Sequence, residues 1–174
     1  LAEPVAMALV NKGFALGELR RSSEAIATYD EVVRRFGDGQ DPALDKQVAM
    51  SLFNRGATLW DLGRFDEAIA TYEEVNLRFG DREEPGLASV MARALHNKGA
   101  TLRALGRSEE AIATYEDVAR RFAGRQEPAF AEPLAKALVN KGLILGELKR
   151  SDEAIEAYDE VLRLFGDRNE PELG

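Results

Sequence analysis

A five-residue motif that returns at a fixed interval most strongly limits what this chain can fold into. The motif is leucine, any residue, asparagine, a lysine or arginine, and glycine, and it ends at Gly13, Gly56, Gly99 and Gly142. Each glycine follows the previous one by 43 residues, without an insertion. A fixed period of this length predicts a stacked array of small units rather than one globular core.

A second motif follows the first in every unit. The tripeptide Glu-Ala-Ile places an alanine twelve residues after each glycine, and a tyrosine comes four residues later: Ala25 and Tyr29, Ala68 and Tyr72, Ala111 and Tyr115, Ala154 and Tyr158. Apolar residues recur at helical spacing through both stretches, which predicts two amphipathic helices per unit. We therefore expect an all-α fold, a right-handed α-solenoid of four antiparallel helix pairs. It would form a single repeat array, with units at approximately 1–41, 42–84, 85–127 and 128–174.

Proline and glycine mark the expected ends of the helices. A proline suits the first turn of a helix, and Pro42, Pro85 and Pro128 recur one period apart. We expect the first, or front, helices over 1–19, 42–62 and 85–105, and the second, or back, helices over 22–36, 65–79, 108–122 and 151–165. In the fourth unit Pro133 predicts a front helix that starts late, near Glu132, or kinks there. Within a unit, a glycine such as Gly56 should let the two helices approach closely by packing opposite Ala68.

The repeated residues resemble the signature of the tetratricopeptide repeat family. In the second unit the resemblance is carried by Leu52, Gly56, Leu59, Gly63, Phe65, Ala68 and Tyr72. The usual repeat of that family has about 34 residues, and the longer unit here is similar to the class seen in kinesin light chain and bacterial scaffold proteins. The resemblance implies a superhelix that binds protein or peptide segments in a concave groove lined by the front helices.

One repeated position departs from that family, which usually has an apolar residue there. It holds a basic residue in every unit: Lys12, Arg55, Lys98 and Lys141. Either these side chains pair with carboxylates of a neighbouring helix, or they form a basic stripe beside the groove; we favour the salt bridges. The repeated acidic pairs on the back helices, such as Glu73-Glu74, are interpreted as a solvated face.

The repeated asparagines are the main candidates for ligand binding. Asparagine is a poor residue for the middle of a helix, and stacked front helices would bring Asn11, Asn54, Asn97 and Asn140 into a row. The row resembles the asparagine ladder of O-linked N-acetylglucosamine transferase and kinesin light chain, which implies contacts with the backbone of an extended peptide. Alternatively, these amides bond neighbouring repeats, face water, or persist from duplication.

Residues that differ between the units are the candidates for specificity. Helical spacing places them beside the asparagine row, where the groove would be apolar in the first two units and basic in the last two. They are Phe14, Phe53, Trp60, Arg93, His96, Arg103, Lys136 and Leu143. The basic clamp with which some family members hold the acidic C-terminus of chaperones would be at most half present, because Val10 and Phe14 occupy two of its positions.

The composition of the chain argues against several classes of function. The chain has no cysteine and one histidine, so we expect no metal site, no cofactor and no catalytic activity. A net charge of −8 argues against a nucleic-acid groove. No long apolar run or signal peptide suggests a membrane, and a cytoplasmic location is the default. Because the sequence opens with Leu1, part-way through a unit, we expect a fragment of a longer array.

Together these features predict a protein–protein interaction scaffold. Two alternatives remain open: a structural module whose ends stack on copies of itself, and a regulatory array within a larger enzyme or transcription regulator. The last back helix favours end-to-end self-association, because a terminal unit normally has a polar outer face. It instead carries Val161, Leu162, Leu164 and Phe165.

Overall fold

The part of the chain that the structure describes is helical throughout. The computed structural model describes residues 1–38, 41–80, 82, 84–122, 124–125 and 128–166, and no strand occurs among them. The helices are α1 (Ala2–Glu18), α2 (Ser22–Phe36), α3 (Pro42–Asp61), α4 (Phe65–Phe79), α5 (Pro85–Ala104), α6 (Ser108–Phe122), α7 (Pro128–Glu147) and α8 (Ser151–Phe165). Expected and observed ends differ by one residue at most outside α7, so the predicted all-α repeat is confirmed.

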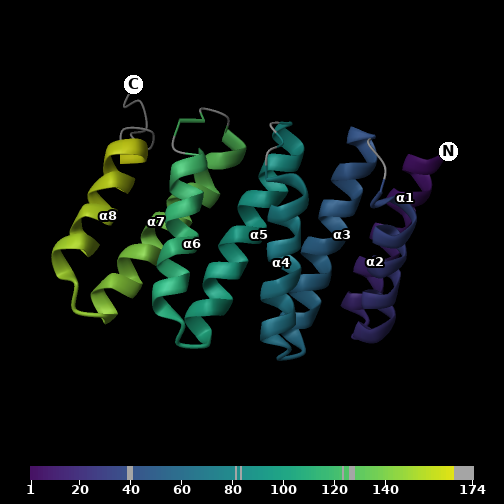
Figure 1. Cartoon of the computed structure of the whole chain (residues 1–174), viewed down its shortest axis with the longest axis horizontal. Coiled ribbons are helices and arrows are strands. Elements are labelled where there is room, and N and C mark those ends of the chain that lie inside the picture. The colour runs from purple at the N-terminus through teal and green to yellow at the C-terminus, as the bar shows by residue number, and fades with distance from the viewer. Residues whose placement is uncertain (39–40, 81, 83, 123, 126–127, 167–174) are drawn as a thin grey trace, which may run out of the picture.

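The eight helices form four pairs that stand side by side in a row, with α1 at one end and α8 at the other (Figure 1). The front helices contact one another in order, α1 with α3, α3 with α5 and α5 with α7; the back helices α2, α4 and α6 each contact the front helices on either side, and α8 contacts α7. Among the described residues no back helix contacts another back helix. The front helices therefore form one continuous layer, and we call the exposed side of this layer the inner face.

Within each unit, the glycine of the repeated motif packs against a tyrosine ring. A Cβ atom added at Gly56 would lie 2.5 Å from Cε1 of Tyr72, and the equivalent distances at Gly13, Gly99 and Gly142 are no longer than 2.6 Å. The atoms nearest to this position therefore belong to Tyr72 rather than to Ala68, which was the expected contact. The tyrosine of the following turn reaches back along the back helix and covers the glycine, because side chains of a helix lean towards its N-terminus.

The turn between the two helices of a unit uses a left-handed residue. Gly63 and Gly106 have φ angles of 72° and 73°, and the N–H of Arg64 donates to the carbonyl of Leu59 at 2.9 Å, which ends α3. In the first and fourth units the same position is held by Arg20 and Lys149, with φ angles of 57° and 61°. Glycine adopts this conformation without steric cost, and residues with a Cβ do not.

The start of α7 departs from the expectation. The helix begins at Pro128 and continues through Pro133, so the predicted late start near Glu132 is wrong. Phe130, in the first turn, is completely buried and stacks on Phe122 of α6 with ring centroids 5.1 Å apart. Burial of a phenylalanine contributes about 1.5–3 kcal/mol, which is similar to the roughly 3 kcal/mol that a proline inside a helix costs through its missing N–H and the clash of its ring.

Ion pairs join each unit to the next at the basic position of the motif. Arg55 pairs with Asp30 at 3.1 Å, Lys98 with Glu73 at 3.4 Å, and Lys141 with Glu116 at 2.9 Å. In each pair the carboxylate lies on the back helix of the preceding unit. These contacts confirm the salt-bridge interpretation for Arg55, Lys98 and Lys141, and no ion pair of Lys12 occurs among the described residues. They also correct the interpretation of the repeated acidic residues as a purely solvated face.

Candidate functional site

The inner face carries three adjoining hollows between the front helices. The α1–α3 hollow has a volume of about 150 Å³, the α3–α5 hollow about 230 Å³ and the α5–α7 hollow about 430 Å³. The first two share Ala57 and Asp61 as lining residues, and the second and third share Asn97. The hollows therefore follow one another along the row of front helices.

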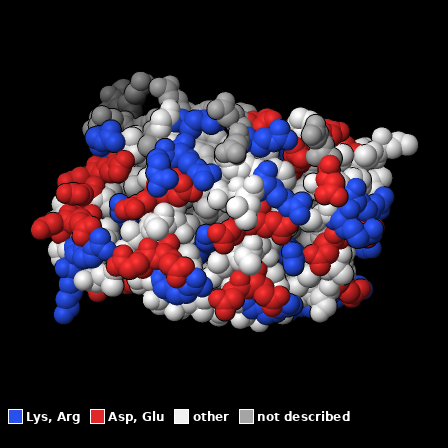
Figure 2. Space-filling view, in the orientation of Figure 1, with Lys and Arg blue, Asp and Glu red and all other residues white. Residues whose placement is uncertain are grey.

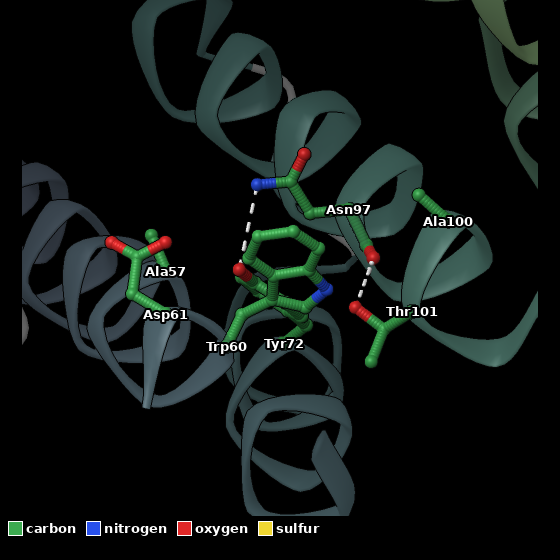
Figure 3. Close-up of a pocket in the computed structure, with 7 residues that line it drawn as sticks. All are labelled: Ala57, Trp60, Asp61, Tyr72, Asn97, Ala100 and Thr101. Atoms are coloured by element: carbon green, nitrogen blue, oxygen red, sulfur yellow. Dashed lines mark hydrogen bonds between the residues drawn. The ribbon is translucent and has the colours of Figure 1, made fainter. Parts of the chain in front are cut away.

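The α3–α5 hollow is centred on the only tryptophan of the chain. It is lined by Ala57, Trp60 and Asp61 of α3, Tyr72 of α4, and Asn97, Ala100 and Thr101 of α5, which meet around it in Figure 3. Trp60 is 45% exposed and makes an edge contact with Phe65 at 6.0 Å between ring centroids. Its neighbours Ala57 and Ala100 are small, so the exposed part of the indole faces an open apolar space.

The α5–α7 hollow combines an aromatic floor with basic side chains. The guanidinium of Arg93 lies over the ring of Phe53, 4.3 Å from its centroid, which buries most of Phe53. Lys136 lies on the other side and is bound to Glu132 of its own helix at 2.5 Å. Among the described residues Arg93 has no acidic partner, so it is the uncompensated cation of this hollow.

His96 is half-buried beside the same hollow. Its Nδ1 atom is buried and has no hydrogen-bond partner in the described part of the chain, and its ring lies 6.0 Å from that of Tyr115. Burial lowers the pKa of His96, and the nearby positive charge of Lys136 lowers it further. Both effects favour the neutral imidazole, which offers the hollow a hydrogen-bonding group.

The α1–α3 hollow contains the other exposed aromatic side chain of the inner face. Phe14 is 58% exposed, and it lines this hollow together with Tyr29 and Asn54. Acidic side chains of Glu18 and Asp61 lie at its edge. An apolar group entering here would contact Phe14, and a basic group would meet the two carboxylates.

The asparagine row connects neighbouring units. Nδ2 of Asn97 donates to the hydroxyl of Tyr72, and Nδ2 of Asn140 donates to that of Tyr115, both at 3.4 Å (Figure 3 shows the first of these). Both tyrosines are buried in the preceding unit, and burial raises the pKa of each to about 12, so the hydroxyls stay protonated. Each bond uses one of the two amide protons. The amide oxygen of Asn97 accepts no hydrogen bond within the described residues and lies between two hollows.

The remaining predicted site residues are placed differently. Arg103 pairs with Glu147 of the next front helix, so its charge is compensated. Leu143 is exposed but lines none of the three hollows, and neither does Asn11 or Asn140. Sequence reasoning missed the acidic residues Asp61 and Glu132. Their signal was helical spacing, since Glu132 lies four residues before Lys136 and Asp61 lies seven residues after Asn54.

Three further features of the described residues bear on function: the surface charge, possible metal ligands and the apolar character of the helices. Acidic and basic side chains are intermingled over the face displayed in Figure 2. No group of histidine, aspartate or glutamate side chains within the described ranges is arranged to hold a metal ion. None of the described helices combines the length and apolar character that crossing a membrane requires.

Comparisons with known proteins agree with the repeat. Two family models, both described as tetratricopeptide repeat, match residues 10–80 and 90–167. No curated protein sequence matches the chain. Among solved structures, the chain is similar to the nearly identical tetratricopeptide-like repeats of a putative kinesin light chain from Podospora anserina, with a TM-score of 0.55 and 12% identity. The match covers 98% of this chain and 99% of that one.

Proposed function

This chain belongs to the tetratricopeptide repeat family, whose repeats generally mediate protein–protein interaction, and we propose that its front-helix face binds an extended segment of a partner protein. The observation that carries the proposal is the continuity of the three hollows along the inner face. Because they share lining residues, side chains on one side of an extended segment, which are at least two residues apart, can enter them in turn.

The lining residues favour particular side chains at two of the hollows. The exposed indole of Trp60 offers an apolar side chain of the partner a flat surface to pack on. Arg93, which has no acidic partner among the described residues, favours an aspartate or glutamate in the α5–α7 hollow. We therefore propose an extended segment that carries an apolar and an acidic residue on the same side, at least two positions apart.

Asn97 is the residue best placed to hold the backbone of such a segment. It lines both the α3–α5 and the α5–α7 hollow, and its amide oxygen and second amide proton have no partner in the described structure. Asn54 lies one unit earlier, on the wall of the α1–α3 hollow. An amide that both donates and accepts suits the alternating N–H and C=O groups of an extended chain.

A library selection followed by matched variants tests the proposal. A random peptide library displayed on phage is selected on the wild-type chain, and the affinity of the enriched peptide is measured by titrating Trp60 fluorescence. Arg93→Met inserts the residue that Met50 provides one unit earlier, and should weaken binding of an acidic peptide about tenfold. Leu77→Ala, at an exposed position of the back helix α4, is the control and should leave the affinity unchanged.

The asparagines need a separate comparison because Asn97 also donates a hydrogen bond to the hydroxyl of Tyr72. Asn54→Ala combined with Asn97→Ala should weaken the selected peptide about tenfold or more, since each lost hydrogen bond contributes about 0.5–1.5 kcal/mol. Tyr72→Phe removes the bond that Asn97 donates but keeps the amide, and should change the affinity less than threefold. Equal losses from the two changes, or binding that Leu77→Ala abolishes and Arg93→Met spares, would refute the proposed groove.

A further inference from the structure

Arginine, lysine and histidine side chains gather in one of the three hollows of the inner face, the one between α5 and α7. Arg93 and Lys136 occupy the same repeat position on these two helices, where the first two units carry Met7 and Met50. The position of His96 likewise holds an apolar residue in those two units. Three departures from the repeated frame therefore meet in a single hollow, which is also the largest of the three, at about 430 Å³.

This hollow contains two cations and one exchangeable counter-ion. Arg93 has no acidic partner among the described residues, and its guanidinium rests on the ring of Phe53, 4.3 Å from the centroid, which restrains it. Lys136 pairs with Glu132, four residues earlier on α7, at 2.5 Å. The side chains of this pair are 59% and 75% exposed, and an exposed ion pair is weak. An entering anion of higher charge can therefore displace Glu132 from Lys136.

Uncharged hydrogen-bond donors complete the lining. Asn97 donates only one of its two amide protons to Tyr72, and the hydroxyl of Ser89 has no hydrogen-bond partner within the described residues. The Nδ1 atom of His96 is buried, so Nε2 is the ring nitrogen that can donate to a group in the hollow. Of the described residues that line the hollow, Glu132 is the only acid. Donors therefore outnumber the oxygens available to them.

Such a lining suits a phosphoryl group better than a single carboxylate. A carboxylate carries one negative charge and two oxygens, which Arg93 alone can bind through two parallel hydrogen bonds. A phosphorylated serine or threonine carries a charge of about −1.5 to −2 at pH 7 and three acceptor oxygens. It can therefore engage Arg93 and Lys136 together and still leave an oxygen for the uncharged donors.

We propose that the α5–α7 hollow binds a phosphorylated serine or threonine side chain of the segment that occupies the inner face. Arg93 and Lys136 bind the phosphoryl oxygens from two successive front helices, and Glu132 is displaced. The inference rests on the proposed function, because the phosphorylated residue reaches the hollow as part of an extended segment whose apolar residue packs on Trp60. Asn97 lines both hollows and so adjoins both of these side chains.

Three forms of one peptide test the preference for a phosphoryl group. The peptide enriched in the selection above is synthesised with phosphoserine, aspartate or serine at its acidic position, and each form is titrated by Trp60 fluorescence. The wild-type chain should bind the phosphoserine form about tenfold more tightly than the aspartate form. Equal affinity for these two forms, both above that for serine, would overturn this inference and leave the proposed groove intact. Equal affinity for all three forms, with Arg93→Met also without effect, would refute both.

Replacing Lys136 distinguishes a phosphoryl group from a carboxylate. Lys136→Met should weaken the phosphoserine form about tenfold and the aspartate form less than about threefold, because Arg93 alone suffices for a carboxylate. Glu132→Gln frees Lys136 and should strengthen binding of the phosphoserine form about threefold. The matched control is Arg34→Met, which removes an exposed positive charge from the back helix α2 and should change neither affinity. Equal losses of both forms in Lys136→Met would overturn the proposal.

The only histidine of the chain reports the phosphoryl group without a peptide. At constant pH 7, inorganic phosphate should shift the imidazole Cε1–H proton resonance of His96 in the wild type, whereas acetate at equal ionic strength should not. The shift should be lost when Arg93→Met and Lys136→Met are combined. Absence of a phosphate-specific shift would overturn the proposal. Inorganic phosphate that binds as tightly as the phosphoserine peptide would also overturn it, since the hollow would then serve free phosphate rather than a segment.

Discussion

Replacing Gly56 by alanine should destabilise the chain, although alanine is the better helix former. The added Cβ would lie 2.5 Å from Cε1 of Tyr72, roughly 1 Å closer than carbon atoms normally approach. The tyrosine ring is completely buried, so it cannot move aside without displacing its neighbours. Overpacking of this kind costs about 1–3 kcal/mol, against a gain of about 1 kcal/mol in helix propensity. We therefore expect a net loss of up to about 2 kcal/mol.

Urea unfolding followed by circular dichroism at 222 nm measures this loss, and Trp60 fluorescence reports the same unit. Gly146→Ala is the matched control, because Gly146 also lies in a front helix and a Cβ there would meet nothing within 4 Å. This variant should be as stable as the wild type, or more stable by up to about 1 kcal/mol. If Gly56→Ala behaves like Gly146→Ala, the close contact with Tyr72 does not exist in solution.

A second change identifies the contacting side chain. Tyr72→Leu removes the ring that the new methyl group would meet, so the combination of Gly56→Ala with Tyr72→Leu should be less destabilised than the sum of the single variants. The coupling between residues in contact is typically about 0.5–3 kcal/mol. Strict additivity would show that the methyl group at position 56 meets a different neighbour, such as Ala68.

Two other predictions follow from the backbone and from the histidine. Arg20→Gly and Lys149→Gly should each stabilise the chain by about 1 kcal/mol, because both residues have positive φ angles where Gly63 occurs in the second unit; a loss of stability in urea would contradict this. The lowered pKa of His96 means that the unfolded chain binds a proton more readily, so His96 stabilises the fold above its usual pKa of 6.5 and this contribution is lost as the pH falls below it. His96→Phe, which copies Phe53, should flatten that part of the pH dependence, and an unchanged slope would count against burial of the imidazole.

The repeat made the fold predictable from the sequence to within one residue at most helix ends. The helix ends are marked by a proline at the start of α3, α5 and α7, a glycine or its substitute in each turn, and a phenylalanine at the end of each back helix. The exception was the start of α7. Pro133 suggested that the helix starts after it. Instead α7 begins at Pro128, where the burial of Phe130 against Phe122 stabilises the first turn. That stacking contact joins two helices, so the local sequence around Pro133 does not reveal it.

Side-chain partners were less predictable than helix ends. Counting along the helices identified Ala68 as the residue opposite Gly56, but a tyrosine side chain spans more than one turn, and Tyr72 fills that space. Similarly, the sequence placed the asparagines in one row without revealing what they contact. The distance of 25 residues between Tyr72 and Asn97, repeated between Tyr115 and Asn140, was present in the sequence. Whether two residues at this distance form a hydrogen bond depends on how one unit packs on the next.

The tyrosine contact and ligand binding need not exclude each other at Asn97. Donating one proton to the Tyr72 hydroxyl restrains rotation of the amide, and the oxygen and second proton then remain at one position between two hollows. A restrained side chain loses less conformational entropy when a ligand binds. The same bond that joins two units would thus prepare the amide for a peptide backbone. On this reasoning Tyr72→Phe should affect binding slightly, through a freer amide, whereas Asn97→Ala removes the contact itself.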